Sequence, residues 1–204
     1  MVYDIRWVDA SVVQRQPTEY RKLNTINPIP MTKSEIPVMP QFFDRYINLA
    51  DNTFLLDALT QAATFDDLIP AKTLEGLGDL RYAPGKWTVK DIVQHMIDNE
   101  RIMSYRAMRF ARNDQTALPG YDEELFAQYT NATRRTIADL YEEYALVRQS
   151  SIALFKSFDE EMLLRSGVCF NQTISVLALG FVLVGHATHH ANIIRERYLP
   201  LLAQ

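Results

Sequence analysis

The sequence has little of the chemistry that marks secreted proteins. Among its 204 residues there is one cysteine, Cys169, so no disulfide can form within the chain. The N-terminus has no basic start followed by an apolar run, and it therefore does not resemble a secretory signal peptide. A lone cysteine fits a reducing compartment and serves more often as a small buried hydrophobe than as a nucleophile. We therefore expect a cytoplasmic protein.

The sequence also lacks a basic excess and a long apolar run. The net charge is −4, which argues against binding to a nucleic-acid backbone. The longest nearly apolar run covers residues 174–185, which is too short to span a bilayer and predicts a buried core helix rather than a membrane partner. A hydrophobic share of 48% and a charged share of 23% are typical of a globular protein with a single core.

Four amphipathic segments dominate the chain, and proline-rich sequence precedes them. Five prolines interrupt residues 1–40, which predicts an extended N-terminal arm, with Trp7 and Val8 as candidate anchors. Apolar residues then recur at three- and four-residue steps in four segments, residues 41–63, 88–113, 123–157 and 174–198. Loops, with one helical turn between residues 73 and 80, separate them, and no strand is expected. We predict an all-α fold in which residues 41–204 form a four-helix bundle.

The four histidines of the chain are confined to two of these predicted helices. His186 and His190 are four residues apart, so they stack on one helix face and can share an ion. His95, on another predicted helix, is the histidine left to supply a third ligand. Three imidazoles leave a coordination position open, which is typical of catalytic rather than structural metal sites. His189 is an alternative ligand to His190, and all four side chains can instead be packing residues.

Several motifs resemble those of one family in the same order along the chain. Residues 84–95, PGKWTVKDIVQH, resemble the PGKW-S/T-V-x-E/D-x-x-x-H segment of the DinB-like family, the DinB/YfiT-like metalloenzymes. Residues 118–122, LPGYD, are similar to the LPGFD loop of that family. Residues 185–190, GHATHH, with RERYL at 195–199, are similar to its GHxxHH…RExYL ending. The resemblance covers about residues 41–199 and leaves the N-terminal arm outside.

The resemblance implies a fold, a cofactor and a range of reactions. It implies an up-down-down-up four-helix bundle that forms a homodimer. It also implies a divalent metal ion, nickel or zinc, held by three histidines that correspond to His95, His186 and His190. Related branches are S-transferases that use bacillithiol or mycothiol and a maleylpyruvate isomerase, so a low-molecular-weight thiol is a candidate second cofactor.

These observations favour a metal-dependent enzyme, a transferase or a hydrolase, acting on a small-molecule substrate. Arg106 and Arg197 lie near the histidine faces of their predicted helices. They are candidates to bind a carboxylate of a thiol cofactor, and the alternative is that both form surface ion pairs. Asp98 or Asn99 is a candidate for orienting a ligand, and the alternative is that each is merely exposed or caps the helix. Tyr82 and Trp87 are candidates for lining the mouth of the site, and Trp87 is alternatively a core anchor before the helix. The alternative is a non-catalytic stress-response bundle that binds a metal or a small ligand.

Overall fold

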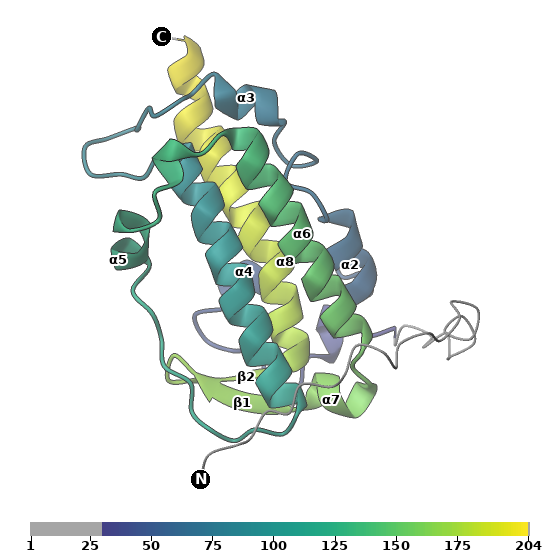
Figure 1. The fold of residues 1–204 in the computed structure, drawn as a ribbon. Coiled ribbons are helices and arrows are strands. Elements are labelled where there is room, and N and C mark those ends of the chain that lie inside the picture. The colour runs from purple at the N-terminus through teal and green to yellow at the C-terminus, as the bar shows by residue number, and fades with distance from the viewer. Residues whose placement is uncertain (1–29, 204) are drawn as a thin grey trace, which may run out of the picture.

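The computed structural model describes residues 30–203, and its centre is a bundle built around three long helices. These are α4 (Val89–Ala111), α6 (Ile137–Lys156) and α8 (Val176–Ile193). Helices α4 and α6 run in the same direction and α8 runs the opposite way, parallel to α2 (Leu55–Gln61) (Figure 1). The order is therefore up-down-down-up, and the predicted four-helix bundle is confirmed.

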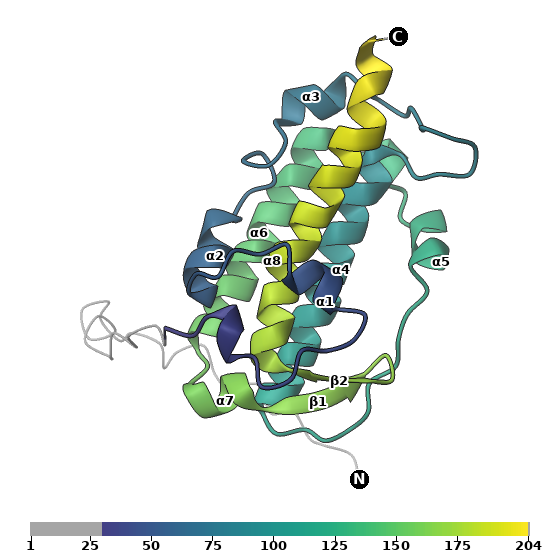
Figure 2. The ribbon, with the colours of Figure 1, turned by 180° about the vertical axis from the view of Figure 1, so that it is seen from behind.

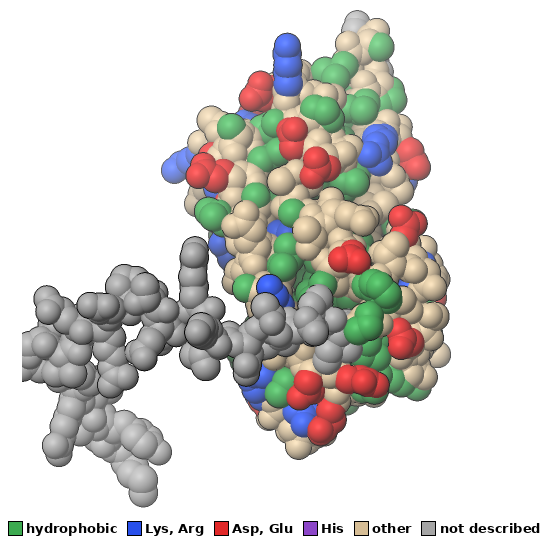
Figure 3. All heavy atoms as spheres, turned by 90° about the vertical axis from the view of Figure 1, so that its right-hand side faces the viewer, with side chains coloured by type: hydrophobic (Ala, Val, Ile, Leu, Met, Phe, Trp, Pro, Cys, Tyr) green, Lys and Arg blue, Asp and Glu red, His purple; other side chains and the backbone are tan. Residues whose placement is uncertain are grey.

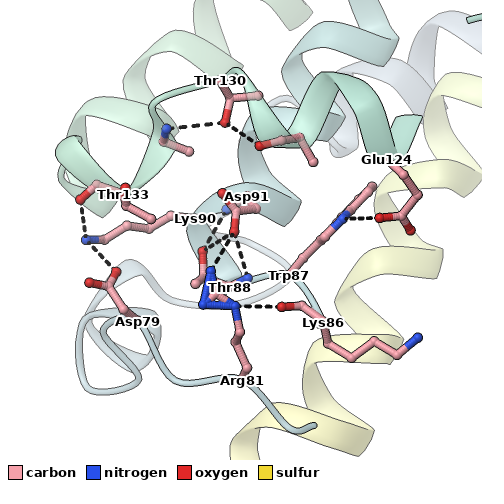
Figure 4. Close-up of polar contacts among 12 residues, drawn as sticks. Asp79, Arg81, Lys86, Trp87, Thr88, Lys90, Asp91, Glu124, Thr130 and Thr133 are labelled. Atoms are coloured by element: carbon pink, nitrogen blue, oxygen red, sulfur yellow. Dashed lines mark hydrogen bonds and ion pairs between the residues drawn. The ribbon is translucent and has the colours of Figure 1, made fainter. Parts of the chain in front are cut away.

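The predicted start of α4 is confirmed by its cap. Thr88 Oγ1 accepts a hydrogen bond of 3.1 Å from the Asp91 amide, and Asp91 Oδ2 accepts one of 2.9 Å from the Thr88 amide (Figure 4). This reciprocal pair satisfies two amides that the helix itself leaves free. The helix ends at Ala111, and Asn113, with φ of 62°, turns the chain away.

The first predicted helix, residues 41–63, is wrong as a continuous element. The structure has α1 (Asp44–Ile47) and α2 there, separated by an irregular segment. Both short helices bury apolar side chains, and Ala50 between them is also buried. The apolar pattern at three- and four-residue steps is therefore mostly accounted for without one long helix. Phe54, which continues the same apolar pattern in the sequence, is 47% exposed. Figure 2 shows α1 lying against α8.

The third predicted helix, residues 123–157, is also divided. It becomes α5 (Glu123–Gln128), the single turn η4 (Ala132–Arg134) and α6. Asn131 has φ of 55°, a left-handed conformation that ends helical hydrogen bonding and that asparagine adopts more readily than most residues. The long connection from α4 to α6 passes through α5, which stands off the side of the bundle (Figure 1).

The expectation of no strands is wrong, because a β-hairpin covers one end of the bundle. Strand β1 (Ser166–Cys169) pairs antiparallel with β2 (Gln172–Ser175), with Val168 opposite Thr173. Phe170 and Asn171, both with φ near 50–57°, form the two-residue turn. The hairpin and α7 (Glu160–Leu164) lie where α4 ends and α8 begins (Figures 1 and 2).

Helix α8 is the core helix of the bundle. It continues beyond Ile193 as a π-helical turn (Ile194–Tyr198) and a 3-10 helix (Leu199–Ala203), past the predicted end at residue 198. The span Val176–Ala203 is long and apolar enough to cross a membrane by length and composition, but 78% of its apolar window is buried within the protein. That burial is typical of a central helix in a globular fold.

The described part of the N-terminal segment packs on the bundle. Met31 is buried in the core, Thr32 pairs with Phe54 in a single β-bridge, and the turn η3 (Lys33–Glu35) follows. Trp7, Val8 and most of the predicted arm lie outside the described residues.

The short helix α3 (Ala71–Glu75) closes the end of the bundle opposite the hairpin (Figure 1). Acidic, basic and apolar side chains are interspersed on the face in Figure 3, where no histidine is visible.

Candidate metal centre

Three histidine side chains converge between α4 and α8. His95 comes from α4, and His186 and His190 lie one turn apart on α8. The Nε2 atom of His186 is 3.1 Å from the Nε2 atoms of both His95 and His190. One ligand atom from each of the three residues lies within 4.8 Å of the others. This group can hold a divalent metal ion, and it brings together the three residues predicted from their spacing.

The nitrogen spacing fits a coordination shell. Zinc binds imidazole nitrogen at about 2.0–2.1 Å, so two such nitrogens at a tetrahedral angle lie about 3.3 Å apart. The observed 3.1 Å is close to that value. His190 Nδ1 is buried without a hydrogen-bond partner among the described residues, so packing rather than a hydrogen bond orients this ring. The donor set therefore suits an ion that accepts three neutral nitrogens.

Burial keeps these imidazoles neutral. Loss of hydration lowers the pKa of His95 to about 4, and His189 adds a smaller effect in the same direction. Burial also lowers the pKa of His186 and His190 well below the ordinary histidine value, and neighbouring histidines lower it further. A neutral imidazole keeps the lone pair that a metal needs, so all three side chains are available as donors at pH 7.

Aromatic rings hold the histidines in place. The Trp87 ring lies 5.0 Å from His95, between centroids, and Tyr46 of α1 lies edge-on to His186 at 5.1 Å. The close approach of α1 depends on Gly185, because a Cβ atom there would lie 1.8 Å from the carbonyl oxygen of Tyr46. The glycine beside His186 therefore lets α1 cover the histidine group.

A cavity of about 170 Å³ opens beside His190. Tyr82 and Trp87 line it, as expected from the sequence, together with Glu124 and Tyr198. Trp87 Nε1 donates a hydrogen bond of 2.9 Å to Glu124 Oε2, which joins α5 to the start of α4 (Figure 4). The cavity gives the histidine group a path by which a small molecule can reach it.

The other predicted site residues do not join this group. His189 lies outside the three-histidine cluster, half-buried, with Tyr46 edge-on to it at 5.2 Å. Arg197 is exposed and donates a hydrogen bond of 3.1 Å to the Tyr82 hydroxyl, at the outer side of the cavity. Arg106 is buried further along α4 and lines a different cavity. Their predicted cofactor contacts stay predictions.

Asn99 has a larger role than the sequence suggested. It lies one turn after His95 on α4, is buried, and donates a hydrogen bond of 2.8 Å from Nδ2 to the Tyr121 hydroxyl. Its Oδ1 atom is buried without a partner among the described residues. A carbonyl oxygen in this position can accept a hydrogen bond from a ligand. The i, i+4 spacing from His95 was the signal available in the sequence. Asp98, the other candidate, accepts instead from Gln94.

A buried ion pair that sequence reasoning missed fixes the helices around the site. Arg148 of α6 binds both carboxylate oxygens of Glu100 on α4, at 2.7 and 2.8 Å. It also donates to the carbonyl of Leu183, one turn before His186 on α8. Its place four residues after Tyr144, on the apolar face of the helix, was the signal that it points inward. This pair sets α8 against α4 close to the histidines.

One solved structure with a similar fold is that of YfiT from Bacillus subtilis, which is described as a probable metal-dependent hydrolase with an unusual four-helix bundle topology. The two chains are 17% identical, with a TM-score of 0.61 over 78% of this chain and 87% of that one, which shows a shared fold. No protein of curated function matches the sequence. The family model of the DinB superfamily matches residues 55–194, which include all three clustered histidines. The chain belongs to the DinB superfamily.

Proposed function

We propose that this protein is a divalent-metal-dependent enzyme and that its reaction is a hydrolysis. His95, His186 and His190 would hold the ion, nickel or zinc. The convergence of three neutral Nε2 atoms in a buried site beside a cavity is the observation that carries the proposal. Three protein ligands leave a position for a small molecule, which is how catalytic sites differ from structural ones.

The bound ion would supply Lewis acidity, which lowers the pKa of a coordinated water or thiol and polarises a carbonyl oxygen. Residues of the chain around the histidines would position the ligand and shape its surroundings. Trp87 shields His95 from solvent, and its hydrogen bond to Glu124 holds α5 over the cavity. The Oδ1 atom of Asn99, which has no hydrogen-bond partner among the described residues, would accept a hydrogen bond from a ligand bound near His95. His189 lies at the side as a partly exposed base.

Hydrolysis is supported by the fold shared with YfiT, whose description names that reaction class. Thiol transfer is the second reaction to test, because the sequence motifs resemble those of thiol-dependent branches of the family. The thiol would have to come from a cofactor. Cys169 is buried in the hairpin, and its burial raises the pKa of the thiol, so it is not a nucleophile for this site.

Metal analysis of the purified protein tests the site. We expect about one divalent ion per chain in the wild type and a loss of it in a His186→Ala, His190→Ala double variant. His189→Ala is the matched control, because it removes a neighbouring imidazole that lies outside the cluster. Equal metal content in the wild type and the double variant would refute the metal site.

Activity assays then separate an enzyme from a binding protein. The metal-loaded and chelator-treated protein would be compared on panels of esters and amides, and on electrophiles with low-molecular-weight thiols. We expect hydrolysis that depends on the metal and is lost in the double variant. Stoichiometric metal with no turnover on any panel would favour the non-catalytic alternative.

A further inference from the structure

A second buried charge in this protein has no carboxylate partner. Arg106 is 3% exposed, and among the described residues its guanidinium donates hydrogen bonds to the carbonyl of Pro119, at 2.8 Å, and to the sulfur of Met103, at 3.4 Å. No ion pair to Arg106 is present among residues 30–203. Arg148, which is equally buried, has Glu100 on two of its nitrogens. The difference indicates that Arg106, unlike Arg148, does not serve to join helices through a buried ion pair.

Burying a charge without a partner is costly, so proteins rarely do so without a functional reason. An arginine keeps its charge at any physiological pH, because its pKa is too high for it to become neutral. The planar guanidinium also offers paired N–H groups that match a carboxylate. The remaining donors of Arg106 are therefore suited to an anion that comes from outside the chain.

Arg106 lines a cavity of about 290 Å³. Most of the wall is apolar or aromatic, from Phe42, Phe43, Met103, Tyr121 and Phe170. This volume is close to the lower end for small-molecule sites. The rings of Phe42 and Phe170 lie 5.3 Å apart, between centroids, and both side chains are partly exposed.

Two of the three acidic residues of the same wall already accept hydrogen bonds. Asp122 Oδ1 caps α5 by accepting from the Leu125 amide at 3.0 Å. Glu124 accepts from Trp87. The third, Glu123, is exposed; partial desolvation raises the pKa of its carboxyl, and the positive charge of Arg45 opposes that rise. Arg106 is thus the positively charged group of this wall, and its guanidinium has N–H groups left over for an anionic ligand.

We propose that this cavity binds a small carboxylate with an aromatic or apolar body, whose carboxylate group pairs with Arg106. That such a ligand is the substrate rests on the proposed function, whereas its binding does not. From His95 to Arg106 the helix rises about 16 Å, and long side chains on a helix lean toward its N-terminus, in this case toward His95. The reacting group of the substrate would therefore be separated from the carboxylate by several bonds.

Binding of three probes of one shape to the full-length protein tests the charge preference. Isothermal titration would compare 3-phenylpropanoate, the neutral 3-phenylpropanamide and the cationic 3-phenylpropylamine. We expect the carboxylate to bind about tenfold to a hundredfold more tightly than the amide, the range of a hydrogen-bonded charge pair. Equal affinity for acid and amide, tighter binding of the amine, or no saturable binding of the carboxylate would each overturn the proposal.

Two variants test whether Arg106 causes the preference for the carboxylate. Arg106→Met should remove the advantage of the carboxylate over the amide, whereas Arg112→Met, at an exposed arginine just after the same helix, should retain it. A preference retained in Arg106→Met would overturn the assignment to Arg106. If that variant does not fold, the wild-type comparison of acid with amide still decides the proposal. Carboxylate binding should persist in the His186→Ala, His190→Ala variant, so a failed metal site and a failed carboxylate site give different results.

Discussion

At the scale of single residues, Gly185 lies where no side chain larger than a hydrogen atom fits without moving α1. A Cβ atom at this position would meet a backbone oxygen, that of Tyr46, at 1.8 Å, so α1 would have to move away from α8. We expect Gly185→Ala to lower the free energy of unfolding by about 2–3 kcal/mol, as overpacking of a core does. Urea unfolding measures this change.

Gly180, one and a half turns earlier on α8, provides the matched control. A Cβ atom there would meet the side-chain methyl groups of Leu55 at 2.7 and 2.8 Å and a ring carbon of Phe155 at 3.0 Å, and these side chains can shift more easily than a backbone carbonyl. Alanine also favours a helix over glycine by up to about 1 kcal/mol at both positions. Gly180→Ala should therefore be near neutral. A loss as large as that of Gly185→Ala would contradict the role given to the Tyr46 contact.

Asp114, which closes the turn after α4, should contribute stability that depends on pH. The amide of Thr116 donates to its carboxylate at 2.9 Å, and that hydrogen bond, followed by the Thr116 side chain and Arg109, lowers the pKa of Asp114 to about 2. A carboxyl with a depressed pKa stabilises the fold above its unfolded pKa of 3.8, and this contribution is lost as the pH falls toward 2.

The measurement is the difference in Tm between the wild type and Asp114→Asn. It should be largest above about pH 5 and should shrink as the pH approaches about 2, where the wild-type carboxyl also becomes neutral. A difference that does not change between these two pH values would show that the charge of Asp114 adds nothing to stability.

At the scale of elements, the Arg148–Glu100 pair joins α4, α6 and α8. Removing Arg148 would leave the Glu100 carboxylate buried without its partner, and such losses cost about 3–5 kcal/mol. We expect Arg148→Met to lower the free energy of unfolding by this amount and Glu100→Leu in the same chain to restore part of it. A double-mutant cycle in urea measures the coupling between them.

The exposed pair between Arg101 and Glu143 is the control for this cycle, because it joins the same two helices, α4 and α6. Arg101 is 50% exposed in its side chain, so solvent screens the interaction. Arg101→Met should cost no more than about 1 kcal/mol. Similar costs for Arg148→Met and Arg101→Met would show that the buried pair does not organise the bundle.

The elements that could be predicted from the sequence are those in which local and long-range signals agree. Helix α4 has a capping pair at Thr88 and Asp91 and a continuous apolar face, and it was predicted to within two residues at its end. The break between α1 and α2 could not be seen, because two short helices and the segment between them bury most of the apolar residues that one long helix would bury. The pattern reports burial rather than continuity.

The hairpin was missed for a reason of turn chemistry. Two-residue hairpin turns of the usual kind need left-handed backbone at both positions, which Asn-Gly marks in a sequence. Here Phe170 and Asn171 adopt it, and phenylalanine gives no such signal. The strands of four residues are also too short to show a convincing alternation. Tertiary packing, with Leu118 alongside Cys169, decides this element.

At the scale of the whole molecule, the candidate metal centre connects two helices that are far apart in the sequence. The ligand set of His95, His186 and His190 could be predicted, because histidine is scarce in this chain and its spacing on α8 is that of one helix turn. The Arg148–Glu100 pair and the burial of Arg106 were not predicted, because a charged residue is expected at the surface. For Arg148 the sequence held one signal of burial, its place four residues after Tyr144.

Because the candidate metal centre joins α4 to α8, we expect metal binding to stabilise the whole fold. An ion that binds only the folded state adds about 2.7 kcal/mol when its free concentration is one hundred times Kd. For a protein of this size that corresponds to an increase in Tm of about 5–10 °C. Calorimetry of chelator-treated protein, with and without added zinc or nickel, measures the increase.

The contribution of α4 to this increase is tested by His95→Ala, which leaves the pair on α8 intact. The substitution also leaves a cavity in the core, so the variant should be less stable than the wild type without metal. The increase in Tm on adding metal is measured for each protein against its own metal-free form, so this destabilisation does not affect it. We expect the increase to be much smaller in His95→Ala and unchanged in His189→Ala. If His95→Ala keeps the full increase, the ion is held by α8 alone, and the metal does not join the two helices.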